Sequence, residues 1–241
     1  MSIISQIVKT PTNIIREKVV HKLNLHKYRD CAHEHRFKWN WKGKRFNRIA
    51  LVNHLVAKTG GWDCHYLEIG CASNALFDSV AAKNKVGVDP EKGGTHRMIS
   101  DDFFAGNDNI FDVIFLDGSH EYQQVRRDAI NALQIVSERG WIAFHDFLPA
   151  DWKEQHVPRI QSAWNGDVWK LAVELGKAEG VEFRIINIDR GVGLLKKLSD
   201  SFDIPDMKSE LAEARFDRFV REVENFPIIE FDDAIALIDS L

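Results

Sequence analysis

The sequence has 241 residues, of which 44% are hydrophobic and 28% are charged, and its net charge is −4. This length and hydrophobic content suffice for one sizeable core, and the balanced charge excludes a disordered chain or a dedicated nucleic-acid binder. No apolar run reaches the roughly 18 residues of a transmembrane helix, and the first residues lack the pattern of a secretion signal. Because three cysteines cannot all pair within one chain, we expect a reduced, cytoplasmic protein.

Charge is distributed unevenly along the chain. Residues 1–45 contain eleven Lys and Arg against three Asp and Glu, whereas residues 198–241 contain four against twelve. One interpretation is that the two ends pack near each other or form solvated faces. The alternative is that the basic end docks on anionic lipid at the inner membrane face or on a phosphorylated carrier. The sequence leaves open whether the chain forms a homo-oligomer.

Hydrophobic spacing predicts a helix over residues 1–24 and another over 46–58, the second closed by Gly60. Between them, residues 25–45 are aromatic, basic and irregular, which indicates an ordered loop.

From residue 65 onward, predicted strands and helices alternate. The strands cover 65–69, 85–88, 97–100, 111–116 and 141–145, and the helices cover 75–82, 121–137 and 166–178. This alternation indicates a parallel sheet with helices on both faces. Two further strands, 181–188 and 193–196, are joined by so short a link that they must pair antiparallel. A helix over 209–224 and a short apolar tail follow, so the predicted fold is a Rossmann-like α/β sheet, mostly parallel with one antiparallel strand.

A candidate cofactor turn follows the strand at 65–69. Gly70 lets the backbone approach a ligand closely, and a helix start behind it adds free N–H donors. Asp89, at the end of the next strand, can accept hydrogen bonds from two ribose hydroxyls, or it can cap a turn before Pro90. The candidate cofactor-binding residues are Glu68, Gly70, Cys71, Ala72, Asn74, Asp89, Ser100, Asp101 and Asp117.

Two of these candidates indicate which cofactor is bound. Ala72 and Asn74 stand where a dinucleotide site usually has further glycines. A pyrophosphate needs several N–H donors, whereas S-adenosylmethionine has no phosphate and carries positive groups that suit Glu68. The turn therefore favours the methyl donor over NAD. Ser100 and Asp101 either border the adenine or cap a short helix.

Acidic and histidine residues follow two neighbouring strands. The strand at 111–116 leads into Asp117 and His120, and the strand at 141–145 leads into His145 and Asp146. Carboxyl ends of parallel strands share one edge of the sheet, so these side chains should meet beside the cofactor. A divalent cation would lower the pKa of a hydroxyl acceptor, and a histidine could take its proton. The catalytic candidates are His120, His145 and Asp117, and the candidate ligands for Mg²⁺ or Mn²⁺ are Asp117, His145 and Asp146.

The stretches Asp117-Gly-Ser-His120 and Gly140-Trp-Ile-Ala-Phe-His145-Asp146 resemble class I S-adenosylmethionine-dependent methyltransferases. The resemblance is to macrolide-sugar O-methyltransferases and related enzymes of bacterial polysaccharide clusters, and it covers roughly residues 64–197. It implies O-methylation of a sugar or glycan hydroxyl, and a sheet that ends in an antiparallel hairpin.

The resemblance also assigns site residues. It implies that Asp117 and Asp146 are metal ligands and that His120 is the base. His145 stands where the family often has an acid, and Phe147 offers no ligand. A metal-free mechanism with His120 or His145 as base therefore stays open.

The expected organisation is a basic helical extension (1–62), a cofactor-binding core (63–197) and an acidic helical extension (198–241). Arg159 lies after the second site strand, where it could hold a phosphate or carboxylate of the acceptor. One alternative is a nicotinamide-dependent oxidoreductase or epimerase of a nucleotide sugar, although the Tyr-x-x-x-Lys pair of such enzymes is absent. The other alternative is a non-catalytic module with the same fold. The expected partner is a small-molecule or glycan acceptor and no nucleic acid.

Overall fold

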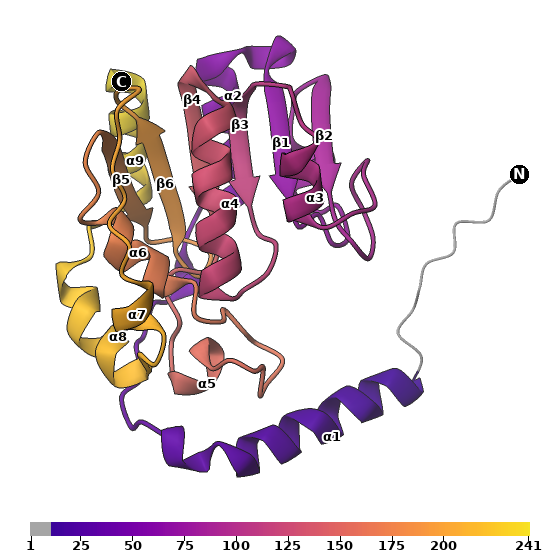
Figure 1. Ribbon diagram of the computed structural model, residues 1–241, viewed down its shortest axis with the longest axis vertical. Helices are drawn as coiled ribbons and strands as arrows, with labels where there is room; N and C mark the ends of the chain where they lie inside the picture. The colour runs from indigo at the N-terminus through magenta and orange to yellow at the C-terminus, as the bar shows by residue number, and fades with distance from the viewer. Residues whose placement is uncertain (1–10) are drawn as a thin grey trace, which may run out of the picture.

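The computed structural model describes residues 11–241, and its centre is a single sheet of seven strands (Figure 1). The strands are β1 (His65–Ile69), β2 (Asn84–Val88), β3 (Phe111–Leu116), β4 (Val136–Phe144), β5 (Val181–Ile186), β6 (Val192–Lys197) and β7 (Ile228–Ile229). Their order across the sheet is β2-β1-β3-β4-β6-β5-β7. β6 runs antiparallel to β4 and β5, and the other neighbouring pairs are parallel. The predicted sheet, mostly parallel with one antiparallel strand, is confirmed.

Helices cover both faces of this sheet, as predicted. The helices are α1 (Pro11–Lys27), α2 (Arg48–Thr59), α3 (Ser100–Ala105), α4 (Tyr122–Ile135), α5 (Trp152–Gln155), α6 (Trp169–Leu175), α7 (Lys208–Leu211), α8 (Phe216–Glu222) and α9 (Phe231–Ser240). Alternate residues of each strand point to opposite faces. Ile114 and Ile142 therefore pack with the α4, α6 and α8 side chains, while Val113 and Trp141 pack with α2 and α9.

Two predicted elements beside the cofactor turn do not form. Residues 75–82 contain only a 3-10 turn at Phe77–Ser79, because the Lys85 ammonium takes the carbonyls of Phe77 and Val80 that would continue a helix. The predicted strand at 97–100 is replaced by one isolated bridge between Val88 and His96. The chain then enters α3 at Ser100, so the predicted short helix forms, although its N-cap is Ile99 and neither Ser100 nor Asp101 caps it.

The C-terminal segment is more ordered than predicted. The expected helix over 209–224 is divided into α7 and α8 by Arg215, whose backbone is extended. In one continuous helix Leu211 and Phe216 would point to different sides, and the break lets both become buried. The predicted apolar tail forms β7, which pairs with β5, and α9, which contacts α2.

The basic and acidic ends of the chain do meet. Lys44 pairs with Glu230 at 2.7 Å, and the ring of Phe37 packs edge-on against Phe216 and Phe219. The predicted loop therefore lies over α8. Residues 1–10 of the predicted first helix lie outside the described residues, and the rest belongs to α1.

None of the helices in residues 11–241 is long and apolar enough to span a membrane. The division into a core and two extensions stays a prediction.

Candidate active site

A cavity of about 640 Å³ opens at the carboxyl ends of β1, β2 and β3. Gly70, Asp89, Asp117 and His120 all contribute to its wall. The remaining lining residues are Ile69, Ala72, Val88, Pro90, Glu91, Lys92, Ile99, Ser100, Gly118, Ser119, Gln124, Arg159 and Trp164. The structure thus joins the predicted cofactor turn and part of the predicted Asp/His cluster in a single cleft.

The turn after β1 is built around Gly70, whose φ angle is 89°. Its N–H donates to the carbonyl of Val88 at 2.8 Å, and a Cβ atom there would overlap the backbone of Asp117. Glycine is therefore required so that the ends of β1, β2 and β3 can close together. Ala72 also has a positive φ angle, which exposes its backbone toward the cavity.

Asp89 caps its own turn and also lines the cavity. Its Oδ2 accepts from the backbone N–H of Ala72 at 2.8 Å, and its Oδ1 accepts from those of Glu91 and Lys92 at 2.8 Å each. The side chain is 11% exposed. This carboxylate ties the turn after β1 to the turn after β2, and its remaining lone pairs can accept from a ligand.

Four predicted cofactor residues do not form part of the cavity wall. Glu68 alternates to the α2 face of β1, where it accepts a hydrogen bond from Tyr66 at 2.5 Å. The Cys71 thiol packs against Gly87 and Gly94, and burial raises its pKa to about 12. The other two hold neighbouring segments: Asn74 accepts from the Gly94 N–H, and Asp101 accepts from Gln124.

Gln124, in the first turn of α4, is a wall residue that the sequence did not indicate. Its side-chain amide donates to Ser100 Oγ at 3.2 Å and to Asp128 Oδ1 at 3.1 Å. This links α4 to α3 at the edge of the cavity. A glutamine in an amphipathic helix carries no signal that separates such a role from simple exposure.

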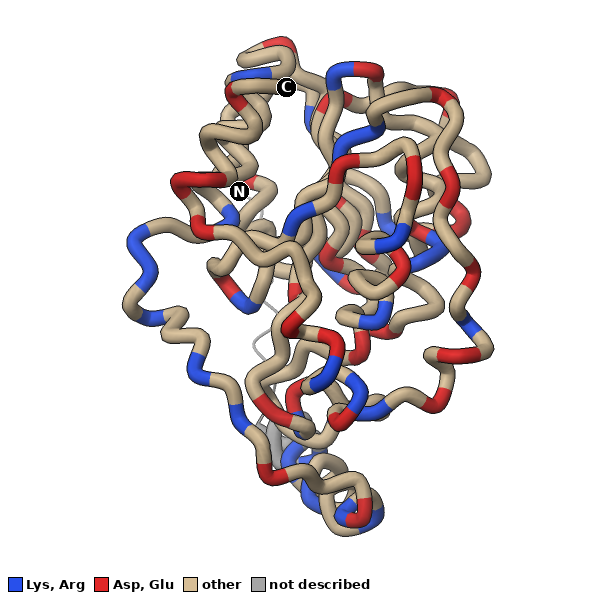
Figure 2. Tube along the Cα trace, turned by 90° about the vertical axis from the view of Figure 1, so that its left-hand side faces the viewer, with Lys and Arg blue, Asp and Glu red and all other residues tan. Residues whose placement is uncertain are grey.

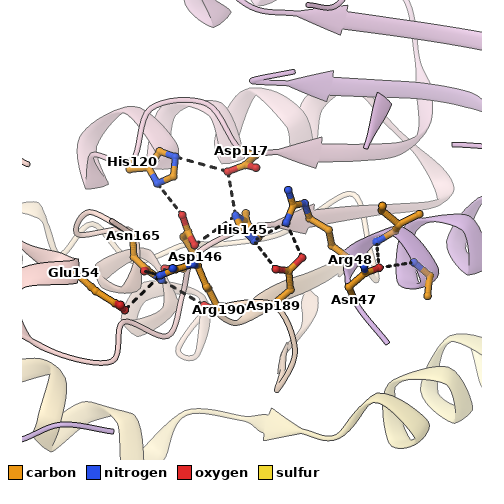
Figure 3. Close-up of polar contacts among 12 residues, drawn as sticks. Asn47, Arg48, Asp117, His120, His145, Asp146, Glu154, Asn165, Asp189 and Arg190 are labelled. Atoms are coloured by element: carbon orange, nitrogen blue, oxygen red, sulfur yellow. Dashed lines mark hydrogen bonds and ion pairs between the residues drawn. The ribbon is translucent and has the colours of Figure 1, made fainter. Parts of the chain in front are cut away.

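The Asp/His cluster connects two strand ends (Figure 3). His120 Nδ1 lies 2.8 Å from Asp146 Oδ2, and His145 Nδ1 lies 3.2 Å from Asp117 Oδ1 and 3.4 Å from Asp146 Oδ1. His120 lines the cavity, whereas His145 is only 8% exposed behind Asp117. His120 can therefore reach an acceptor, and His145 is placed to hold the two carboxylates.

The contacts within the cluster shift the pKa values of His120, His145 and Asp146. Burial alone would lower the pKa of His120 and His145, but the carboxylates of Asp146 and Asp117 outweigh it and raise both values. Burial alone would raise the pKa of Asp146, but the two histidines outweigh it and lower the value. Without a bound ligand, the cluster thus favours charged carboxylates and protonated imidazoles.

Two further members of the cluster come from outside the predicted site. Arg48, at the start of α2, donates to Asp189 Oδ2 at 2.6 Å, and Asp189 Oδ1 lies 3.8 Å from His145 Nε2 (Figure 3). Burial raises the pKa of Asp189, but His145 and Arg48 outweigh it and lower the value. Asp189 lies in the tight turn between β5 and β6, where its backbone has a positive φ angle of 41°.

The backbone of Asp146 is in the left-handed region, with a φ angle of 70°. Its carbonyl accepts a hydrogen bond from the Asn165 side chain at 3.1 Å, and Asn165 in turn accepts from Arg190 at 3.0 Å. Asn165 is fully buried. A strained residue held by buried neighbours is typical of a functional site, because the surrounding structure keeps its side chain aimed.

Asp117, His120 and Asp146 each offer a donor atom, and these three atoms lie within 4.8 Å of one another. Neither His120 Nδ1 nor Asp146 Oδ1 has a hydrogen-bond partner of good geometry, although both are buried. Two carboxylates and an imidazole suit a divalent cation, which would satisfy these two atoms. The structure favours His120 over the predicted His145 as the third donor.

The far wall of the cavity comes from the loop between α5 and α6. Trp164 stacks on His120 with 5.1 Å between ring centroids, and the Arg159 guanidinium lies 5.7 Å from the Trp164 ring. Trp164 also donates to the His156 carbonyl at 2.8 Å. An aromatic and a cationic side chain therefore stand next to His120, where an acceptor would enter.

The sheet order, the glycine turn after β1 and the acid after β2 define the Rossmann-like fold of class I methyltransferases. Residues 50–147 match the family model described as a methyltransferase domain. The general resemblance stated from the sequence is confirmed, and its sugar-specific part stays a prediction.

Individual proteins show the same likeness. A protein of Acanthamoeba polyphaga mimivirus is 22% identical over 62% of this chain and 79% of its own length. A Corynebacterium glutamicum protein is similar in structure, with 13% identity, a TM-score of 0.47, and coverage of 77% of this chain and 91% of that one. The O-methyltransferase TomG of Streptomyces achromogenes, solved with SAM, has 14% identity, a TM-score of 0.43, and coverage of 63% and 80%.

Proposed function

We propose that the protein is an S-adenosylmethionine-dependent O-methyltransferase that acts on a sugar or glycan hydroxyl. The observation that carries this proposal is the shared cavity, in which Gly70 and Asp89 line one part and Asp117 and His120 line another. A donor held by the first pair would face an acceptor held by the second. Methyl transfer is an in-line displacement, so much of the rate enhancement comes from aligning the two reactants.

Each part of the cavity has its own role in this proposal. The carboxylate of Asp89 accepts from the ribose hydroxyls, and Ile99 and Val88 supply apolar surface beside the adenine. Ala72 and Asn74 stand where a dinucleotide site usually has glycines, which suits a cofactor without a pyrophosphate.

His120 is the residue that takes the acceptor proton, and for this role its Nε2 must first lose the proton that the cluster favours. Nε2 lies 3.7 Å from Asp117 Oδ1, and the 2.8 Å contact of Nδ1 with Asp146 stabilises the imidazolium that forms on transfer. His145 holds the carboxylates of Asp117 and Asp146 behind it, and Asp189 contacts His145 from its other ring nitrogen. Neither His145 nor Asp189 lines the cavity. Trp164 offers an aromatic face, which suits the apolar face of a sugar ring.

Asp117, His120 and Asp146 are also the residues that would hold Mg²⁺ or Mn²⁺. A cation bound there would lower the pKa of the acceptor hydroxyl and orient its oxygen. The unpartnered atoms of His120 and Asp146 support this second mechanism. Turnover that persists in EDTA would assign His120 as the base, and turnover that requires added Mg²⁺ would assign it as a ligand.

The proposal is tested first by cofactor binding. Calorimetry of the full chain should show binding of S-adenosylhomocysteine and none of NADH. Asp89→Ala should weaken the binding of S-adenosylhomocysteine at least about tenfold, because it removes one good hydrogen bond to a charged group. The matched control is Asp102→Ala, an exposed acid of α3 outside the cavity. Transfer of labelled methyl to a panel of sugars and glycans then tests the acceptor. Binding of NADH alone would replace the proposal with an oxidoreductase, and binding of neither would leave a non-catalytic module.

A further inference from the structure

The outward face of α1 combines cationic and apolar side chains. From residue 16 onward, the exposed side chains that the structure describes are Arg16, Lys18, Val19, Val20, Lys22, Leu23, His26 and Lys27. Val19 is 50% exposed and Leu23 is 65% exposed, although each is large and apolar. None of these exposed side chains is acidic, and the only acid in the sequence of α1 is Glu17.

The opposite side of α1 fixes the helix to the cavity loop. Asn24 donates to the Arg159 carbonyl at 3.2 Å, and the rings of Tyr28 and His156 lie 4.6 Å apart. Leu25 packs with Tyr28 against the core. Figure 1 shows α1 across the end of the molecule toward which β1 and β3 point, which is the end that carries the cavity. A surface bound by α1 would therefore lie next to the entrance used by the acceptor.

Charge separates this end of the molecule from the rest. Figure 2 shows Lys and Arg gathered along α1, while most Asp and Glu lie over the body of the protein. The net charge of the chain is −4, so the basic helix is an exception within an acidic protein. An anionic bilayer would attract α1 and repel the body, which favours one orientation.

We propose that the outward face of α1 binds an anionic lipid bilayer and holds the cavity entrance against it. Basic residues interleaved with Val and Leu on an exposed helix are what an interfacial helix requires, because cations pair with lipid phosphates while the apolar side chains enter the headgroup boundary. The ten residues before α1 add one lysine and no acid. The proposal does not depend on which group the enzyme transfers.

A second copy of this chain fits the face less well. The acidic region of the molecule is residues 198–241, which contain twelve Asp and Glu. Seven of these already pair with cations of their own chain: Asp200, Asp206, Glu210, Asp217, Glu222, Glu230 and Asp239. Nucleic acid would match the cations but would leave Val19 and Leu23 without apolar contacts.

The test is co-sedimentation of the full chain with vesicles of phosphatidylcholine, alone or mixed with phosphatidylglycerol. Wild type should bind the mixed vesicles and not the neutral ones, and added NaCl should weaken binding. Lys18→Glu with Lys22→Glu should weaken binding more than about tenfold, because each basic residue near an anionic surface contributes about fivefold. Val19→Ser with Leu23→Ser should also weaken binding, which a purely electrostatic contact would not predict.

The matched control is Lys83→Glu with Lys177→Glu, which makes the same charge change at exposed positions before β2 and β5, at the opposite end of the sheet. This variant should bind vesicles like wild type. Thermal unfolding and S-adenosylhomocysteine affinity should be unchanged in all variants, so loss of vesicle binding is separated from failure of the proposed enzyme. Failure of wild type to bind anionic vesicles, equal binding of the control and the α1 variants, or loss of a dimer instead of vesicle binding would overturn the proposal.

Discussion

The imidazole of His120 lies 2.8 Å from the carboxylate of Asp146, and these two residues come from different strand ends. Their contact closes the gap between the loop after β3 and the loop after β4. It also gives a cavity-lining histidine a nearly buried acidic partner, because Asp146 is only 3% exposed. The chemistry assigned to the cavity depends on this pair.

Replacing His120 by alanine should lower kcat by about 10² to 10⁴, the usual contribution of a general base. The affinity for S-adenosylhomocysteine should stay within a factor of about three, since Asp89 and the turn after β1 are untouched. Added imidazole should restore part of the rate if His120 is the base. His35→Ala, in the exposed loop before α2, serves as the control. Full turnover by His120→Ala would rule out the assigned role.

Cation binding should become tighter as pH rises. The neighbouring carboxylates raise the pKa values of His120 and His145 above the ordinary 6.5, so protons compete with a cation for the cluster up to a higher pH than they would at free imidazoles. Calorimetry with Mn²⁺ in buffers of different ionisation heat measures both affinity and protons released. Asp146→Asn should abolish binding, and the exposed Asp102→Asn should not. Affinity that is independent of pH would argue against this donor set.

The ion pair between Arg48 and Asp189 should stabilise the fold. Both side chains are about three-quarters buried, and their contact is 2.6 Å. Asp189→Asn should lower the free energy of unfolding by about 1–3 kcal/mol at neutral pH, because it leaves Arg48 without its charged partner. The pKa of Asp189 is lowered from 3.8, so this stabilisation is present above that value and disappears as pH falls through the lowered pKa.

The control for Asp189 is Asp217→Asn, which breaks the exposed pair between Asp217 and Arg221. Exposed pairs contribute at most about 1 kcal/mol. Urea unfolding of Asp189→Asn and Asp217→Asn measures the free energy of unfolding that each variant loses. Equal losses would show that the pair between Arg48 and Asp189 stabilises the fold no more than an exposed pair does.

Burial raises the pKa of Glu68 from 4.5 to about 7, despite the hydrogen bond from Tyr66. The folded protein therefore binds this proton more tightly than the unfolded chain does. Its stabilising effect is fully present below 4.5 and disappears as pH rises through about 7. Glu68→Gln should remove up to about 3 kcal/mol of this pH dependence. Urea unfolding across that range tests it, with the exposed Glu138→Gln as control, and parallel curves for wild type and Glu68→Gln would contradict it.

The strands at 65–69 and 111–116 were predictable to the residue, since each is a run of strand length that ends at a turn-forming residue. The same runs located Gly70 and Asp117. Glu68 was misplaced because its type suited a cofactor charge, although strand alternation puts it on the face of Tyr66. The alternation of the strand, and not the charge of the side chain, therefore determines where Glu68 lies.

Arg48 and Asp189 could not be predicted from the sequence. Arg48 follows no strand, and Asp189 follows β5 at the site edge but lies in a turn that the sequence marks only as a short link. Their contacts depend on how α2 and the β5–β6 turn sit against β4. The same holds for Asn165, which reaches Asp146 from a loop. Contacts of this kind are set by tertiary packing, on which local hydrophobic spacing carries no information.

Arg48 and Asp189 are separated by 141 positions along the chain, yet they share one ion pair. A polypeptide emerging from the ribosome would complete β1 to β4 well before the partner of Arg48 had been synthesised. The ion pair can therefore form only after the hairpin of β5 and β6 has docked beside β4. Contacts between such distant positions also slow folding, because a long loop must close before they can form.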